Sequence, residues 1–450
     1  MDTMDDKEPS TVRMVRRMKG IRKEVARNRA VTVTTERIRA LPLAPANVAR
    51  GFGSSSATSY TEPAQTIPVH TACDVLVVGS GPAGLSAAIG AARAGVDVVL
   101  VERFGCFGGV ITTVGMETLG WYRYDGATND SEGIGTELER IATRMGGSTK
   151  WPYNDSQCLD ADQFKLVADR LVKEHGIRPL LHTLVVSAVV DRGTIVGVVT
   201  ESKSGRRAIR AQRVVDCTGD ADIAHLAGAR YTCSERTERM GLTQVFSAAG
   251  VDTKRFLAYT EANPQTYADW VGVWDQRTAG KEDALRSPML QREFDAARAR
   301  GVAFGDGGIH GLDGAVTATG DDAASKAGQA AVVGGSWSAL TSAGEATNLN
   351  LVHLKGFDAL DVDDLTRAEM AGRANVVGAL NALRSQVPGF EAAKLRNLSM
   401  TIGSLTSQTV PFLHIMSLSR LLTHFVCHNT LTVPTNCQIY IFVCANSFSQ

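Results

Sequence analysis

The stretch from Asp74 to Glu102, DVLVVGSGPAGLSAAIGAARAGVDVVLVE, constrains the fold more than any other part of the chain. An apolar run leads into a glycine-rich turn, a helix of small residues follows, and a second apolar run ends on an acid. This order is typical of a β-α-β unit that binds a dinucleotide. We therefore predict a parallel α/β sheet here, with a phosphate site at the start of the helix.

Each part of the turn has a separate role. Gly79 permits the tight turn, Gly81 lets a pyrophosphate approach the backbone, and Gly84 lets the helix lie close to the strand. Glu102 can accept hydrogen bonds from a ribose hydroxyl. Nicotinamide and flavin cofactors both use such a unit, so the motif alone leaves that choice open. The predicted cofactor residues of this unit are Gly79, Gly81, Pro82, Ala83, Gly84 and Glu102.

Further motifs connect the chain to a known family. After Glu102 the sequence reads RFGCFGGVIT, and much later an apolar strand (Arg213 to Asp216) leads into Thr218-Gly219-Asp220 of the motif DCTGDAD. With these motifs the chain resembles the FAD-dependent oxidoreductases of the glutathione-reductase-like superfamily. Within it, the chain is most similar to the group that includes the flavoprotein subunit of heterodisulfide reductase. The other matching segments are YTEPAQTIPV (60–69), DDLTRAEMAGR (363–373), LRSQVPGFE (383–391) and Ile402-Gly403.

The resemblance implies FAD as the cofactor and a hydride transfer between an unidentified small-molecule substrate and flavin N5. It also implies that Thr218, Gly219 and Asp220 form a second cofactor-contacting turn beside the first one. Asp220 either contacts the cofactor or caps the next helix. The site residues that the resemblance adds are Arg103, Gly108, Gly109, Thr112, Thr218, Gly219 and Asp220.

The fold implied by the resemblance is α/β: a Rossmann-like, three-layer FAD/NAD(P)-binding domain with an inserted α+β substrate domain. The sequence pattern within it predicts a helix over 162–174, strands over 183–190 and 195–200 joined by a turn, and a helix that resumes near Asp364. The predicted divisions are an extension and linker (1–58), the first part of the FAD domain (59–228), the substrate domain (229–348), an incomplete helical return to the FAD domain (349–403) and an atypical tail (404–450).

The amino-terminal extension is strongly basic between Thr11 and Arg39, where Glu24 and Glu36 are the only acids. Its apolar residues fall on one face of a helix, so a basic amphipathic helix is expected. A mitochondrial targeting segment is one interpretation and a flexible basic arm is another; the acids among the first eight residues count against the former. We expect a cytoplasmic protein, with a mitochondrial location as the alternative.

Eight cysteines are scattered along the chain without a CxxC pair, so neither an iron–sulfur cluster nor a redox disulfide is expected. Cys106, near the expected flavin, is interpreted as a packed residue. If electrons pass through a cluster, a separate iron–sulfur protein must be the acceptor. The 47 basic and 47 acidic side chains balance, which gives no reason to expect a nucleic acid partner. No apolar run is long enough to span a membrane.

The tail departs from the rest of the chain. Between Ser404 and Gln450 it has one charged residue, Arg420, although 21% of the whole chain is charged. The resembled family continues after Ile402-Gly403 with a Val-Arg-Glu-Ser/Thr-Arg-like string, which is absent here. We therefore predict that 404–450 does not belong to the fold, with a divergent native tail as the alternative.

Function is therefore predicted as an FAD-dependent oxidoreductase. A truncated, non-catalytic form with impaired FAD binding is the alternative, and an NAD(P)-dependent dehydrogenase a lesser one. The catalytic residues remain unknown. His310 and His225 are considered as proton-transfer groups, and Arg384 as a ligand for an anionic substrate or a partner of an acid. None of the three is assigned.

Overall fold

The computed structural model describes residues 62–117, 133–150, 157–229, 232–233, 241–266, 290–302, 330–337, 339–404, 408–409 and 439–441. The chain divides into two compact units, Met1–Gln65 and Thr66–Gln450, and every described helix and strand belongs to the second. The predicted extension 1–58 and its basic segment lie outside the described residues.

The first sheet has the strand order β5-β2-β1-β8-β7-β6, and β16 also pairs with β8. Its strands among the described residues are β1 (Val69–Val78), β2 (Val98–Val101), β5 (Arg178–Leu180), β6 (Leu184–Asp191), β7 (Thr194–Glu201), β8 (Arg207–Asp216) and β16 (Ile439–Ile441). Strands β5, β2, β1 and β8 are parallel, whereas β8, β7 and β6 form an antiparallel meander. The carboxyl ends of β1 and β8 therefore lie side by side, with Val78 opposite Asp216.

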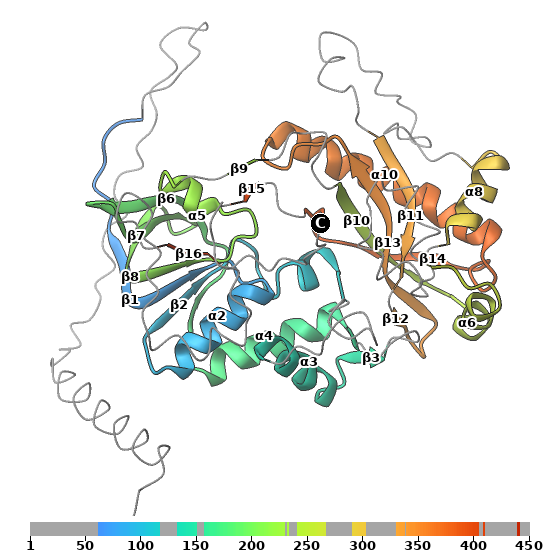
Figure 1. Cartoon of the computed structure of the whole chain (residues 1–450), viewed down its shortest axis with the longest axis horizontal. Helices are drawn as coiled ribbons and strands as arrows, with labels where there is room; N and C mark the ends of the chain where they lie inside the picture. The colour runs from blue at the N-terminus through green and yellow to red at the C-terminus, as the bar shows by residue number, and fades with distance from the viewer. Residues whose placement is uncertain are drawn as a thin grey trace, which may run out of the picture. The chain divides into compact units, whose positions relative to one another are not determined.

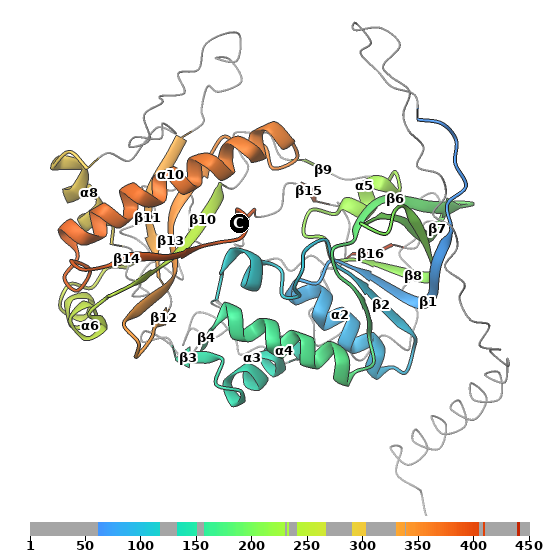
Figure 2. The ribbon, with the colours of Figure 1, turned by 180° about the vertical axis from the view of Figure 1, so that it is seen from behind.

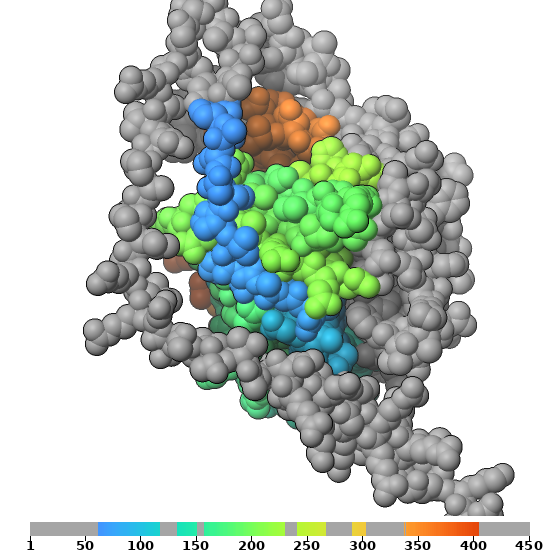
Figure 3. All heavy atoms as spheres, turned by 90° about the vertical axis from the view of Figure 1, so that its left-hand side faces the viewer, coloured from blue at the N-terminus to red at the C-terminus, as the bar shows by residue number. Residues whose placement is uncertain are grey.

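Both faces of this sheet are covered (Figures 1 and 2). Helices α2 (Pro82–Arg93), α3 (Ile134–Arg144) and α4 (Ala161–Glu174) pack on one face, against the side chains that include Val77 and Leu100. The meander and α5 (Asp222–Leu226) pack on the other, against Leu76 and Val99. This alternation follows from the two-residue period of a strand. The result confirms the predicted three-layer, Rossmann-like α/β domain. The start of β1 remains at the surface (Figure 3), with Val69 55% exposed.

A second, antiparallel sheet has the order β11-β13-β10-β14, with β12 paired to β13. Its strands are β10 (Leu242–Ala249), β11 (Ala330–Ser336), β12 (Ala339–Leu340), β13 (Glu345–Lys355) and β14 (Lys394–Leu398). Its helices are α6 (Thr253–Ala262), α8 (Gln291–Ala299) and α10 (Val362–Gln386). The ring of Phe256 lies with its centroid 4.9 Å from those of both Trp337 and Phe390 in the core beneath them. The expected boundary at residue 348 falls inside β13, and α10 packs in this second core rather than in the first.

Local patterns explain several elements. Helix α4 begins at Ala161 because the Asp160 side chain accepts a hydrogen bond from the N–H of Gln163, and Asp361 caps α10 in the same way. The predicted turn between β6 and β7 has Arg192 and Gly193 both at positive φ, which suits a tight hairpin. A small hairpin of β3 (Ser148–Lys150) and β4 (Gln157–Leu159) completes the described part of the helical layer.

Two short strands lie within the segment 404–450. Strand β15 (Gln408–Thr409) pairs with β9 (Thr232–Cys233), and β16 runs parallel to the end of β8. The sequence did not predict these pairings. The other residues beyond 404 lie outside the described ones, so the exclusion of this tail from the fold stays a prediction.

Candidate functional site

The glycine turn joins the end of β1 to the start of α2. Gly79 has φ +89°, and a Cβ there would lie 2.3 Å from the carbonyl oxygen of Cys217. A Cβ on Gly84 would lie 1.9 Å from the carbonyl oxygen of Gly79. Any side chain at these two positions would therefore collide with the backbone of the protein itself.

Gly81 is different, because the fold does not require a glycine there. Its φ of −61° suits any residue, and the nearest atom to an added Cβ would be the Cα of Gly109 at 3.9 Å. The space in front of it faces the start of α2, which has Pro82 in its first turn, no acid there and no side-chain cap. Open space beside the positive end of a helix suits a phosphate, so these residues fit a dinucleotide.

Glu102 locks the turn to the tip of β2. Its carboxylate is 5% exposed. Oε2 accepts hydrogen bonds from the Ser80 N–H at 2.9 Å and from the Ser80 hydroxyl at 2.6 Å, and Oε1 accepts one from the Phe104 N–H at 2.9 Å. Because each carboxylate oxygen can accept two hydrogen bonds, Oε1 keeps one position for a ribose hydroxyl. Sequence reasoning missed the role of Ser80, since a serine in a glycine-rich turn is an ordinary loop residue.

The loop after Glu102 returns to the glycine turn. The Gly108 N–H donates to the carbonyl oxygen of Ser80 at 2.9 Å, and Gly109, at φ +52°, has its Cα against Gly81. The Thr112 side chain is buried, and its hydroxyl donates to the carbonyl oxygen of Phe107 at 2.7 Å. Arg103 is exposed, with its guanidinium carbon 4.7 Å from the centroid of the Phe104 ring. The structure thus brings both predicted glycines to the turn, while Thr112 holds the shape of the loop.

The second predicted turn lies beside the first. The Cys217 N–H donates to the carbonyl oxygen of Val78 at 2.8 Å, and Thr218 and Gly219 follow. Gly219 is exposed at φ +93°, with no atom within 4 Å of an added Cβ. These positions stand where strands β1 and β8 end, which is the edge at which open α/β sheets bind ligands.

The helix after the second turn has a capping residue that the sequence analysis did not propose. The N–H groups of Ile223 and Ala224 donate to Asp216 Oδ2 at 2.9 and 3.0 Å, and the Asp222 N–H donates to the Thr218 hydroxyl. Asp216 therefore caps α5 from the end of β8. Burial raises the pKa of Asp216, and the hydrogen bonds that its carboxylate accepts from Thr218, Ala224 and Ile223 act in the opposite direction. Burial, followed by the charges of Asp220 and Asp216, also raises the pKa of Asp222 to about 6.

Comparison with known proteins identifies the family. The model of a family described as FAD dependent oxidoreductase matches residues 74–406. The chain belongs to the FAD dependent oxidoreductase family. Its cofactor is therefore FAD, and the fit of Gly81 and Glu102 agrees with that assignment.

Three relatives show how far the similarity extends. Digeranylgeranylglycerophospholipid reductases 2 and 1 of Methanopyrus kandleri are 34% identical over 166 residues and 33% identical over 165. Each alignment covers 34% of this chain, and it covers 40% and 42% of the respective reductase. A solved structure of a geranylgeranyl bacteriochlorophyll reductase-like protein from Thermoplasma acidophilum is 20% identical, with a TM-score of 0.33, over 40% of this chain and 48% of that one. The chain thus spans less than half the length of the curated relatives.

The structure describes two of the three candidates for catalysis, His225 and Arg384. His310 is not among the described residues. His225 is exposed on α5, and the Arg384 Nε donates to the carbonyl oxygen of Ala393 at 2.6 Å, which gives Arg384 a role in holding the end of α10. The sulfur of Cys106 lies 3.7 Å from the Thr112 hydroxyl oxygen. The catalytic residues of this family member stay unassigned.

Sequence reasoning missed Glu117, which lies just beyond η1, a π-helix over Val110–Val114. The Glu117 carboxyl is 6% exposed; the Thr347 hydroxyl of β13 lies 2.5 Å from Oε2, and the Ala161 N–H donates to Oε1 at 3.2 Å. Burial raises the pKa of Glu117 to about 7, an effect that these two hydrogen bonds reduce and the charges of Asp160 and Asp162 increase. Nothing in the local sequence GMETLG marks this contact, because its partner is 230 residues away.

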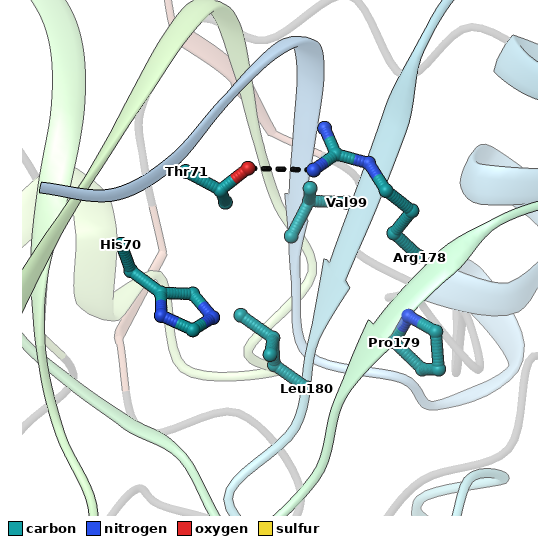
Figure 4. Close-up of a pocket in the computed structure, with 6 residues that line it drawn as sticks. All are labelled: His70, Thr71, Val99, Arg178, Pro179 and Leu180. Atoms are coloured by element: carbon teal, nitrogen blue, oxygen red, sulfur yellow. Dashed lines mark hydrogen bonds between the residues drawn. The ribbon is translucent and has the colours of Figure 1, made fainter. Parts of the chain in front are cut away.

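A cavity of about 270 Å³ lies at a different place (Figure 4). Its lining residues are His70, Thr71, Val99, Arg178, Pro179 and Leu180. The guanidinium of Arg178 donates four hydrogen bonds: two to the carboxylate of Asp97, one to the Thr71 hydroxyl and one to the Ala72 carbonyl. None of the predicted FAD residues lines this cavity.

The described residues of this family member contain no group of three or more His, Cys, Asp or Glu side chains placed to hold a metal ion. Cys73, Cys106, Cys158 and Cys217 form no disulfide in the described part of the chain. Of the helices in the described residues, none combines the length and apolarity needed to cross a bilayer.

Proposed function

We propose that this chain binds FAD across its two turns and acts as an oxidoreductase on a small molecule. When bound, the flavin supplies the position that accepts or gives a hydride. The single observation that carries the proposal is Gly81 at the positive end of α2, where an added Cβ would meet no atom of the protein closer than 3.9 Å. Because the fold itself does not require a glycine at position 81, we explain this glycine by the close approach of a bound ligand.

Each proposed site residue then has a physical task. Gly81, with Pro82 and Ala83 at the first turn of α2, receives the pyrophosphate, while Gly79 and Gly84 let strand and helix approach. Glu102 accepts a hydrogen bond from the ribose. The remaining proposed contacts lie on the returning loop and the second turn: Arg103, Gly108, Gly109, Thr112, Thr218, Gly219 and Asp220.

We also propose a narrower group for this chain within the FAD dependent oxidoreductase family. The motifs RFGCFGG and DCTGDAD support a place among proteins similar to the flavoprotein subunit of heterodisulfide reductase. The electron acceptor stays unassigned; because the sequence has no CxxC pair, we propose that any iron–sulfur cluster that accepts the electrons belongs to a separate protein. The named relatives reduce digeranylgeranylglycerophospholipids, but the partial coverage of their length leaves the substrate of this chain unidentified.

A non-catalytic form with weakened FAD binding is the second candidate. The nearly uncharged segment 404–450, in place of the string expected after Gly403, favours it. The two candidates share the glycine turn and differ in whether the chain retains the cofactor.

A competition titration tests the proposed cofactor site. The full chain is titrated with FAD, followed by the change in flavin fluorescence, and then with NAD⁺ in excess. We expect saturable FAD binding with a dissociation constant in the range of about 1 μM or tighter, and no displacement by NAD⁺. Displacement of FAD by NAD⁺ at comparable concentrations would contradict the proposal and favour a nicotinamide site.

A further inference from the structure

One short segment connects the second sheet to the loop that carries the proposed FAD contacts. We name Ser399–Gly403, which continues from β14, the crossing segment. Its ends are held by β10: the Ser399 N–H donates to the Val245 carbonyl at 2.9 Å, and Gly403 and Thr243 exchange two backbone hydrogen bonds. Its middle is held by η1 instead, since the N–H groups of Met400 and Thr401 both donate to the carbonyl oxygen of Thr113, at 2.8 and 3.3 Å.

The crossing segment has no room to move against η1. A Cβ on Gly403 would lie 2.8 Å from Val114 Cγ1 and 2.8 Å from Thr243 Cγ2. Atoms of η1 and of β10 thus already enclose the backbone of this glycine. A shift of the crossing segment toward η1 therefore has to displace η1 as well.

Within η1, the backbone leads directly to a proposed cofactor contact. The N–H groups of Thr112 and Thr113 donate to the carbonyl oxygen of Gly109 at 3.0 and 2.8 Å, and the Thr113 hydroxyl donates to the same oxygen at 2.8 Å. Gly109 in turn lies against Gly81. The crossing segment is thus two residues removed, through Thr113 and Gly109, from the space in front of α2.

Glu369 on α10 is the side chain that fixes this segment. Its Oε1 accepts a hydrogen bond from the Thr401 hydroxyl at 2.9 Å and one from the Ile402 N–H at 2.8 Å. Its Oε2 accepts one from Arg373 Nη1 at 2.6 Å. Helix α10 runs beside β14 (Figure 2), so the carboxylate reaches the point at which the chain leaves the sheet. Hydrogen bonds to a charged acceptor are the stronger ones in proteins.

We propose that Glu369 is a positioning residue of the FAD site: it holds the crossing segment on η1 and so keeps Gly109 where the cofactor needs it. This inference rests on the proposed function. Glu369 does not touch the cofactor, and its effect passes through Thr113.

The test compares three variants of the full chain. In Glu369→Ala both hydrogen bonds to the crossing segment are lost, and we expect the FAD dissociation constant to rise about tenfold. In Glu369→Gln the amide oxygen can accept the same two hydrogen bonds, so affinity should stay within about threefold of the wild type. Arg373→Ala is the matched control: it removes the ion pair on α10 but leaves Oε1 in place, and we again expect a change within about threefold.

Two further measurements separate positioning from general stability. The visible spectrum of bound FAD should shift in Glu369→Ala and return to the wild-type form in Glu369→Gln. Hydrogen exchange of the chain without FAD should become faster, by about tenfold, both in the crossing segment and in 108–114. Unchanged affinity and spectrum in a folded Glu369→Ala would overturn the proposal. Faster exchange in the crossing segment alone would overturn it too, because η1 would then be independent.

If Glu369→Ala does not fold, Thr401→Val tests the same proposal. It removes the hydrogen bond from the Thr401 hydroxyl to Glu369 and leaves the carboxylate and its bond from the Ile402 N–H in place. We expect a smaller effect, about threefold on FAD affinity, with faster exchange in 108–114. Wild-type behaviour in both measurements would overturn the inference. A wild-type chain that fails to bind FAD would refute the proposed function instead, and the exchange measurement would still decide whether Glu369 holds η1.

Discussion

The substitution Gly81→Ala separates what the fold needs from what a ligand needs. A methyl group at this position would have its nearest neighbour at 3.9 Å, and φ −61° is favourable for alanine. Alanine is a poorer N-cap than glycine, but it also lowers the entropy of the unfolded chain. Since these effects oppose each other, we expect the free energy of unfolding without FAD to change by less than about 1 kcal/mol.

The effect on FAD should be much larger. The methyl group would occupy the space in front of α2 into which the pyrophosphate has to come. We expect the dissociation constant for FAD to rise at least about tenfold, which is about 1.4 kcal/mol of binding free energy. The assays are urea unfolding of the chain without FAD and a fluorescence titration with FAD.

Two glycines of the same unit serve as controls. In Gly90→Ala, the new Cβ would lie 3.7 Å from Ile134 Cδ1, an ordinary contact, so the helix should gain about 0.5–1 kcal/mol and FAD affinity should not change. In Gly84→Ala, the contact at 1.9 Å should cost about 1–3 kcal/mol of stability together with FAD binding. Wild-type FAD affinity in Gly81→Ala, or a loss of stability equal to that of Gly84→Ala, would refute the reasoning.

Three other predictions follow from the buried carboxyl groups. The pKa of Glu117, raised from 4.5 to about 7, means that the ionised form destabilises the fold; this cost is absent below pH 4.5 and complete above pH 7. The free energy of unfolding of Glu117→Gln, minus that of the wild type, should therefore grow by about 3 kcal/mol as the pH rises from about 4.5 to about 8.5. Urea unfolding at several pH values measures this difference, and a difference that does not change with pH would contradict the prediction. Asp216→Ala should lose about 2–3 kcal/mol because it uncaps α5, and Asp220→Ala less than about 1 kcal/mol; equal losses would show that the capping assignment is wrong. Glu102→Gln should weaken FAD binding about tenfold in the fluorescence titration, and an unchanged affinity would show that FAD binding does not need the negative charge of Glu102.

The sequence predicted those parts of the fold that are determined by residues close together in the chain. The apolar runs around Val77 and Leu100, separated by a glycine turn, are enough to define the parallel strands and the helix between them. The hairpin turn at Arg192-Gly193 likewise follows from its own residues. These elements depend on the period of apolar residues and on backbone conformations that few residues adopt.

The parts that sequence did not predict depend on partners far along the chain. Asp216 was interpreted as the last residue of a strand, and its capping of α5 became visible only when the turn was folded. Glu117 acquires its environment from Thr347 on the other sheet, and Glu369 from the residues beyond β14. Helix α10 was placed with the first domain because its motif resembles that of the family, but its apolar side chains pack under the second sheet.

The measurement that tests the central claim most directly is the visible absorption spectrum of the purified full chain, before and after incubation with FAD and desalting. The proposed site predicts flavin bands that remain with the protein, at about one FAD per chain. A colourless protein after desalting would contradict a competent FAD site and would favour the non-catalytic form.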